Sequence, residues 1–277
     1  MLDTESKMLT VGTFNIRGWS EEQHDGINAW RNRAALTITT IKGMAADCLG
    51  LQEFSGNKNL QFYTDNLDGH ELHLGTCMDD GRFNPIVYNS RNLRIQGSSA
   101  IWLNQNDEPK PDWGAQETRS ATLVNFEYRP THCVSDGNIL FVNTHLDHRS
   151  ELAQIEGTKK ILQRVERYPY PTVVVGDQNT NVGHTSVAYD LFLQAGFQEA
   201  FINANSTMEE DLPPTFHHFK GENYSPPSNH GTRHIDWIMY RGFTPQACDI
   251  VYEYQLQPPH YPSDHYPKVA NLRVDLE

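Results

Sequence analysis

Residues 139–145 read Ile-Leu-Phe-Val-Asn-Thr-His and residues 172–177 read Thr-Val-Val-Val-Gly-Asp, and these two stretches decide the fold. Their first four residues are apolar or β-branched and do not alternate with polar ones. A strand with one wet face alternates, whereas a strand covered on both faces is apolar throughout. Both stretches are therefore predicted to be strands of a sheet covered on each side, which requires a layered fold.

Further runs of strand length and of helical periodicity surround these two stretches. Trp30, Ala34, Ile38 and Ile41, for example, recur at helical spacing. The predicted helices are Asn28–Lys42, Asn57–Asp68, Glu151–Glu166 and Ser186–Ala195. The predicted strands are Leu9–Ile16, Asp47–Leu51, Pro85–Tyr88, Ala121–Phe126, Ile139–Asn143, Thr172–Val175, His234–Tyr240 and Lys268–Val274. This mixture predicts an α/β fold, and two long polar loops, 104–114 and 203–232, are expected to shape a site.

Composition limits the function classes. No composition shift or repeat divides the 277 residues, so we expect a single domain over residues 1–277. The net charge is 22 − 35 = −13, which argues against clamping long DNA but still allows a short or small phosphate ester. No apolar run reaches the roughly 18 residues of a membrane span, and no secretory signal is evident, so a cytoplasmic protein without membrane contact is expected.

Several chemistries can be set aside from missing or poor motifs. Cys48, Cys77, Cys133 and Cys248 are scattered without a C-x-x-C pair, so we expect reduced core thiols rather than disulfides or a thiolate zinc site. The His70-Glu-Leu-His73 segment is one residue short of the zinc metalloprotease motif H-E-x-x-H and looks like a strand, so it does not favour a metalloprotease. The nucleophile elbow G-x-S-x-G, the P-loop and the G-x-G-x-x-G fingerprint are absent from the sequence, which excludes serine hydrolases, P-loop NTPases and dinucleotide enzymes.

Polar side chains follow four of the buried runs, at the point where each strand should end. These residues are Asn15, Glu53, His145 and Asp177. Side chains at the carboxyl ends of strands converge on a crevice in α/β proteins, so we expect these four to share one active site. Asn179 lies two residues beyond Asp177 and points the same way if the extended geometry continues. The pair would then act together.

The donor types indicate a hard metal ion and a phosphate. Carboxylate and amide oxygens without thiolates favour Mg²⁺ or Mn²⁺ over zinc, and such ions suit phosphate substrates. Later in the chain, Asp236 lies in a predicted strand and His265 in the Pro-bounded loop 262–267. A carboxylate reaching His265 would fix its tautomer and favour its charged form, and Asp236 is the candidate partner.

Six motifs, in this order, resemble the metal-dependent endonuclease/exonuclease/phosphatase superfamily, in particular its small bacterial and deadenylase-like members. The motifs are Thr13-Phe-Asn-Ile-Arg17, Leu51-Gln-Glu53, Asn143-Thr-His-Leu-Asp-His148, Gly176-Asp-Gln-Asn179, His234-Ile-Asp-Trp-Ile238 and Ser263-Asp-His265. The resemblance spans roughly residues 9–274. It implies a DNase I-like, four-layer α/β/β/α sandwich, with two mixed β-sheets packed face to face and helices outside.

The resemblance also implies roles for the matching residues. Asn15 and Glu53 would form the metal pole of the site, with Glu53 the direct ligand, and Asp264 would bind metal or phosphate. Asp177 would orient or deprotonate the attacking water, and Asn179 would contact the phosphate.

The other residues singled out by the resemblance are ones whose charge would matter for the reaction. His145 would stabilise the pentacovalent phosphorus, and Asp236 with His265 would form a charged pair opposite. Arg119 would either meet a phosphate of the substrate or lie on the surface. Arg82 stands where many relatives have Glu, a change of sign that would favour a more anionic substrate or weaken catalysis.

These expectations amount to a Mg²⁺- or Mn²⁺-dependent phosphoesterase. The first expectation is a phosphodiesterase or nuclease that hydrolyses short or single-stranded nucleic acid or a small phosphodiester by in-line attack of water. The alternatives are a phosphomonoesterase, favoured by Arg82, and a degenerate domain that binds phosphate or a protein without turnover. The sequence does not indicate an oligomeric state.

Overall fold

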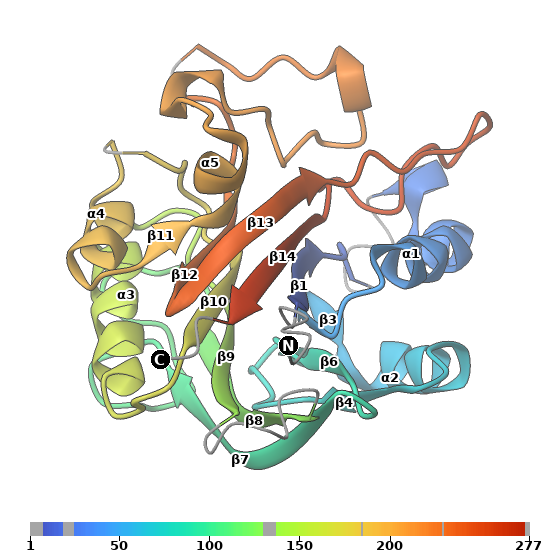
Figure 1. Cartoon of the computed structure of the whole chain (residues 1–277). Helices are drawn as coiled ribbons and strands as arrows, with labels where there is room; N and C mark the ends of the chain where they lie inside the picture. The colour runs from blue at the N-terminus through green and yellow to red at the C-terminus, as the bar shows by residue number, and fades with distance from the viewer. Residues whose placement is uncertain (1–7, 19–24, 130–136, 184, 229, 275–277) are drawn as a thin grey trace.

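The computed structural model describes residues 8–18, 25–129, 137–183, 185–228 and 230–274. In these residues the chain forms two six-stranded mixed sheets and a two-stranded ribbon (Figure 1). The first sheet has the order β13-β14-β1-β2-β6-β4 and the second the order β11-β12-β10-β9-β8-β7, while β3 pairs with β5. Parallel pairs, β1 with β2 and β9 with β10, lie at the centre of each sheet.

The strands of the first sheet are β1 (Met8–Asn15), β2 (Cys48–Gln52), β4 (His70–His73), β6 (Ile86–Asn89), β13 (Phe243–Ile250) and β14 (Lys268–Val274). Those of the second sheet are β7 (Leu93–Trp102), β8 (Ser120–Tyr128), β9 (Asn138–His145), β10 (Thr172–Asp177), β11 (Gln198–Glu199) and β12 (Asp236–Arg241). The ribbon consists of β3 (Phe54–Ser55) and β5 (Arg82–Phe83).

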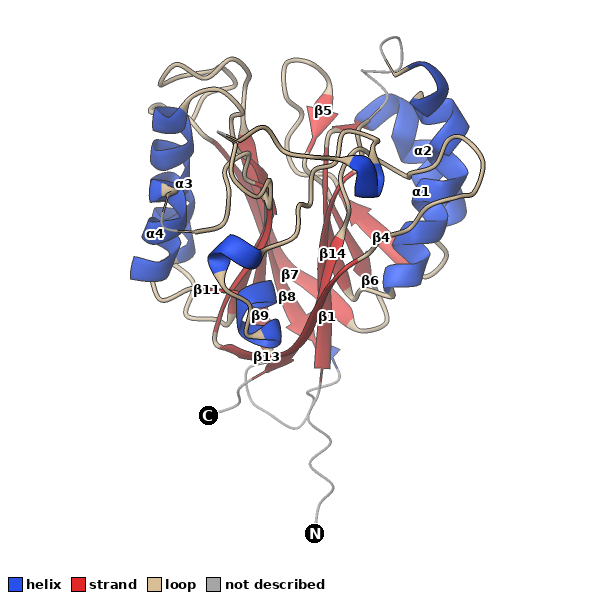
Figure 2. Cartoon of the chain, turned by 90° about the horizontal axis from the view of Figure 1, so that it is seen from above, coloured by secondary structure: helices blue, strands red, loops and turns tan. Residues whose placement is uncertain are grey.

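Helices cover the outer face of each sheet, so the molecule has four layers (Figure 2). Helices α1 (Trp30–Met44) and α2 (Gly56–Asn66) pack on the first sheet, and α3 (Glu151–Val165) and α4 (Val187–Gln194) pack on the second. A short helix, α5 (Ala200–Asn205), contacts β12 and β13. The α/β/β/α sandwich predicted from the sequence is confirmed.

Alternate residues of the central strands enter two different cores. On β10, Val173 and Val175 face the core between the sheets, while Val174 faces the core under α3 and α4. On β9, Phe141 faces inward and Val142 outward in the same way. Both faces are therefore buried against apolar layers, which is the physical reason for the uninterrupted apolar runs.

Of the strands at the sheet edges, β7, β11 and β13 were not predicted, whereas β4 coincides with the strand-like segment His70–His73. β7 and β13 each close one sheet and carry exposed or half-exposed residues over much of their length. β13 also contains Pro245 beside a register shift, a position that only an edge strand or a bulge tolerates. Strands with one solvated side lack the continuous apolar run that marks the central strands.

Two local boundaries differ from the expectations. The first helix begins at Trp30, not Asn28, because residues 26–28 form a 3₁₀ turn and Ala29 is extended. The polar segment from Asn203 begins inside α5, and the rest is loop with short 3₁₀ turns at residues 209–211 and 221–223.

Of the helices in the described ranges, none is long and apolar enough to cross a membrane.

The expectation for the cysteines is wrong at one position. Cys48 and Cys248 are buried free thiols, but Cys77 is exposed. Cys77 lies in the loop between β4 and β5, whereas Cys48 and Cys248 lie in strands. Cys133 lies outside the described residues.

Candidate active site

The candidate site lies where central strands of the two sheets end. In the second sheet, β9 and β10 are parallel and place His145 opposite Asp177, and the antiparallel β12 places Asp236 on the other side of Asp177. In the first sheet, β1 and β2 are parallel and end together, so Glu53 lies beside Asn15. The strand-end residues picked out from the sequence are therefore neighbours in space.

Asn15 links the two sheets at this point. Its Nδ2 donates to Glu53 Oε1 at 3.1 Å and to Asp177 Oδ2 at 3.0 Å. Its Oδ1 accepts a hydrogen bond from the backbone N–H of Arg17 at 3.0 Å. Asn15 thus turns its amide nitrogen, not its oxygen, toward the carboxylates and holds them in place.

Asp177 is the carboxylate with the most partners in the site. Its Oδ1 accepts from the backbone N–H of Asn179 at 2.9 Å, and its Oδ2 lies 3.4 Å from His145 Nε2 and 3.7 Å from His265 Nε2. Burial opposes ionisation of Asp177, but the two imidazoles and the Asn15 amide outweigh it and hold its pKa well below the ordinary value. Asp177 is therefore an ionised acceptor of hydrogen bonds.

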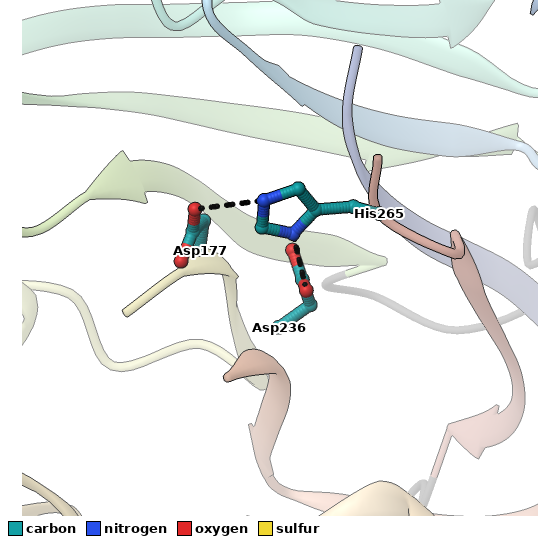
Figure 3. A group of neighbouring side chains, drawn as sticks. All are labelled: Asp177, Asp236 and His265. Carbon is teal, nitrogen blue, oxygen red and sulfur yellow. Dashed lines mark hydrogen bonds and ion pairs between the residues drawn. The ribbon is translucent and has the colours of Figure 1, made fainter. Parts of the chain in front are cut away.

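His265 lies between two carboxylates (Figure 3). Its Nδ1 is 2.9 Å from Asp236 Oδ2, the contact expected from the sequence, while its Nε2 faces Asp177. Burial disfavours the charged imidazole, but Asp236 and Asp177 more than offset this and raise the pKa of His265 to about 10. His265 is accordingly a buried imidazolium with both nitrogens protonated.

Asp177, Asp236 and His265 also bring three ligand-type atoms within 4.8 Å of one another, close enough for one metal ion. A histidine binds metal only through an unprotonated nitrogen, however, and both nitrogens of His265 face carboxylates. We therefore interpret this group as an ion-paired charge cluster.

Glu53 and Asp264 form the acidic end of the site. Oε2 of Glu53 is buried without a hydrogen-bond partner. Burial works against ionisation, yet His145, Arg82, Arg17 and the Asn15 amide lower the pKa of Glu53 to about 2. Burial and the nearby Glu53 charge raise the pKa of Asp264. An ionised glutamate with an orphaned oxygen beside a second acid suits an oxygen-binding divalent cation.

Asn179 is fixed by its backbone and its side chain. It adopts the left-handed region with φ of 53°, and its N–H caps the Asp177 carboxylate. Its Nδ2 donates to the Leu146 carbonyl at 3.1 Å and lies 2.9 Å from His145 Nε2. The segment following β10 therefore holds an amide against the imidazole that lines the pocket.

A cavity of about 370 Å³ opens onto these side chains. Seven of the nine residues predicted for the site line it: Glu53, Arg119, His145, Asp177, Asn179, Asp264 and His265. Asn15 and Asp236 lie behind the wall, bonded to lining residues. Arg82 also lines the cavity.

Six lining residues were not predicted to belong to the site: Arg17, Glu117, His148, Phe216, Arg233 and Ile235. Arg17, His148, Arg233 and Ile235 lie within or next to the quoted motifs, so adjacency to a motif is the signal that would have found them. Phe216 lies in the polar loop 203–232, which was expected to shape a site, whereas no comparable signal marks Glu117, which lies in the loop before β8.

No protein-family model and no curated protein sequence matches the chain. Solved structures, in contrast, match nearly all of it. The endonuclease/exonuclease/phosphatase from Bacteroides vulgatus has a TM-score of 0.81 at 25% sequence identity, covering 97% of this chain and 100% of that one. The resemblance is thereby confirmed: the chain has the DNase I-like fold of the endonuclease/exonuclease/phosphatase superfamily.

Two further similar structures have more specific names. The mannosyl-6-phosphatase of Bacteroides thetaiotaomicron has a TM-score of 0.79 at 22% identity and covers 95% of this chain and 99% of its own. TDP2 from D. rerio, complexed with a single-strand DNA product, has a TM-score of 0.73 at 16% identity. The match covers 96% of this chain and 99% of the TDP2 chain. At these identities the similarity establishes the shared fold and not a shared substrate.

Proposed function

We propose that this protein is a divalent-metal-dependent phosphoesterase that hydrolyses a phosphate ester by attack of water. The observation that carries the proposal is the cavity wall itself, where an ionised Asp177, two imidazoles and the unpaired Glu53 oxygen meet. This set combines a water-binding anion, two imidazoles of which His265 is cationic, and a place for a hard cation.

The metal would be held by Glu53, with Asp264 beside it. The fit rests on the orphaned Oε2 and on oxygen donors without thiolates, which suit Mg²⁺ or Mn²⁺. When bound, the ion would supply positive charge for the phosphate oxygens and the leaving group. Asn15 would keep Glu53 in place through its hydrogen bond to Oε1.

Asp177 binds and orients the attacking water in this proposal. A good general base has a pKa near the working pH, whereas that of Asp177 is held far lower by its neighbours. Asp177 therefore accepts a hydrogen bond from the water, and this bond directs a lone pair of the water oxygen at phosphorus. Asn179 binds a phosphate oxygen through its amide, next to His145.

The two histidines stabilise the charge that develops on phosphorus. His265 is kept charged by Asp236, and the nearby His145 faces the same cavity. In the reaction, the water oxygen bonds to phosphorus while the P–O bond to the leaving group breaks on the opposite side. One water proton ends on the released alcohol, so a phosphate and an alcohol are the products.

Cleavage of a phosphodiester in short or single-stranded nucleic acid, the first expectation from the sequence, is a second candidate. Phe216 lines the cavity, and the Arg233 guanidinium lies 4.7 Å from the centre of its ring. An aromatic face paired with an arginine is a stacking platform for a base. The likeness to TDP2 complexed with single-strand DNA is compatible with this candidate.

The test is hydrolysis of p-nitrophenyl phosphate and bis-p-nitrophenyl phosphate with Mg²⁺, with Mn²⁺ and with EDTA. We expect activity only with metal, and a loss of about 100-fold or more in Asp177→Asn, as for other groups that act on the attacking water. Asp68→Asn, an exposed aspartate, is the matched control. A folded protein without turnover under any metal would instead support the degenerate binding domain.

The substrate class is then tested by comparing the rates at which the protein hydrolyses single-stranded RNA, single-stranded DNA and inositol phosphates. Cleavage of the nucleic acids with release of short products would support the second candidate. Cleavage of monoesters alone would rule it out.

A further inference from the structure

One end of the cavity is rich in arginine, although the chain as a whole carries a charge of −13. Arg82 and Arg119 line this end together with Glu117 and His148. Both guanidiniums face the same carboxylate: Glu117 Oε2 contacts Nη2 of Arg82 and lies 3.7 Å from Nη2 of Arg119. The two cations are thus held around one shared anion.

Arg119 is buried but incompletely paired. Only 6% of the residue is exposed, and its Nε has no hydrogen-bond partner, with Asp147 Oδ2 the nearest carboxylate oxygen at 3.9 Å. Its Nη2 lies 3.3 Å from Nδ1 of His148. A buried guanidinium has five donors and is costly to leave unsatisfied, so this arrangement favours an additional anionic acceptor.

Arg82 is placed beside the acidic end of the site by the ribbon. β5 pairs with β3 so that Arg82 lies opposite Ser55, two residues beyond Glu53. Its guanidinium also contacts Asp80, which is 36% exposed. Arg82 therefore faces the cavity from the side where Glu53 would hold the metal.

Glu117 is the exchangeable member of the group. Its side chain is 30% exposed and comes from the loop before β8, so it is the shared partner of the two arginines that can turn outward. Its carboxylate binds the two arginines in the way that phosphate oxygens would, since guanidinium forks fit both groups. An incoming phosphate can take the place of Glu117.

We infer that Arg82 and Arg119, with Glu117 as a displaceable counter-ion, form a subsite for the extra charge of a terminal phosphate, so that phosphomonoesters are preferred over diesters. A monoester carries about −1.5 to −2 charges near pH 7 and three terminal oxygens, whereas a diester carries one charge and two. The inference rests on the proposed function and assigns the substrate class of the same site.

The test compares kcat/KM for p-nitrophenyl phosphate and bis-p-nitrophenyl phosphate in the full chain with Mg²⁺. The wild type should prefer the monoester. Arg82→Met should lose about tenfold or more on the monoester, the value of one charge-assisted hydrogen bond, and less than threefold on the diester. Arg94→Met, at an exposed arginine of the edge strand β7 that pairs with Glu127 of β8, should leave both rates unchanged.

A second measurement does not depend on turnover. Inorganic phosphate should raise the melting temperature of the wild type, more so in Glu117→Gln and less in Arg82→Met. An equal loss on both esters in Arg82→Met, or a wild type that prefers the diester, would overturn the inference. If neither ester is hydrolysed but phosphate protects in an Arg82-dependent manner, the subsite stands and the proposed function fails.

Discussion

Asn15 and Asp177 are joined by a hydrogen bond of 3.0 Å from Nδ2 to Oδ2, although they are 162 positions apart in the chain. Asn15 ends β1 of the first sheet, and Asp177 ends β10 of the second. The bond therefore fixes the two sheets to each other at the candidate site. Because Asn15 also donates to Glu53, one amide sets the spacing between Glu53, the proposed metal ligand, and Asp177, the proposed water-binding carboxylate.

Replacing Asn15 by Ala should lower both stability and activity. The variant loses two hydrogen bonds to carboxylates, each worth about 1.5–3 kcal/mol, so we expect the free energy of unfolding in EDTA to fall by about 3 kcal/mol. Urea denaturation and kcat on a phosphate ester measure the two effects. Asn106→Ala, an exposed loop asparagine, is the control. Wild-type stability in Asn15→Ala would contradict the bridging role.

The residues at the ends of buried strands could be predicted because each follows a local apolar run. His145 and Asp177 are examples, since the strand and the polar residue after it are visible in one short stretch. What the local pattern does not contain is distance across the sandwich. The contact between Asn15 and Asp177 depends on how two sheets pack, and that packing is a property of the whole chain.

The cavity rim was less predictable for a different reason. Glu117 and Phe216 lie in loops, where neither period 2 nor period 3.6 constrains the sequence. Their positions depend on contacts such as the one between the Phe216 and His265 rings, whose centroids are 5.0 Å apart. Edge strands such as β7 escaped prediction because one solvated side dilutes the apolar pattern.

Binding of Mg²⁺ should stabilise the protein through Glu53. A ligand that binds only the folded state at 100 times its Kd adds about 2.7 kcal/mol, so the melting temperature should rise on titration with the metal. Glu53→Gln removes the ionised donor and should abolish the rise. Glu108→Gln, an exposed loop glutamate, should retain it. An undiminished rise in Glu53→Gln would place the metal elsewhere.

Lys268 and Glu199 form a fully buried ion pair at 2.7 Å, with both side chains 0% exposed. Removing one partner of such a pair leaves an uncompensated charge, so Lys268→Met should cost about 3–5 kcal/mol in urea unfolding. The double variant Lys268→Met/Glu199→Gln should recover much of this loss, because Gln is neutral and keeps an oxygen to cap α5 at Ile202. A double variant no more stable than the single one would argue against charge burial as the cause.

The stability should fall in mild acid through His234. Burial first, and then the adjacent Lys268, hold the pKa of His234 well below its ordinary value of 6.5. Below pH 6.5 the unfolded chain therefore takes up a proton that the folded state refuses, which lowers the free energy of unfolding as the pH falls.

The groups facing His234 are Lys268 at 2.8 Å, the Pro213 carbonyl at 2.7 Å, the Phe201 ring, and Glu199 through Lys268. Between pH 7 and pH 5.5 the histidine should contribute a loss of about 1 kcal/mol. Between the same two pH values, the free energy of unfolding of His234→Gln should fall by about 1 kcal/mol less than that of the wild type. Urea unfolding at both pH values measures this difference. Parallel pH dependence in the two proteins would contradict the assignment.

Arg33 should affect activity by positioning the chain segments next to the site. Its guanidinium is fully buried and donates from Nη1 to the carbonyls of Ile16 at 2.6 Å and Pro262 at 2.7 Å, and from Nη2 to that of Arg17. These carbonyls belong to the segments that follow Asn15 and precede Asp264. One side chain therefore ties the segment that follows Asn15 to the loop that carries Asp264.

Arg33→Lys keeps the charge but loses the planar fork, so at least two of these hydrogen bonds should be lost. Since each is worth about 1.5–3 kcal/mol, we expect a stability loss of about 3 kcal/mol and a fall in kcat of about tenfold, with KM less affected. Arg31→Lys, on the exposed side of the same helix, is the matched control. A wild-type kcat in a destabilised Arg33→Lys would show that Arg33 supports the fold without positioning the site, because the two readouts respond separately to these two roles.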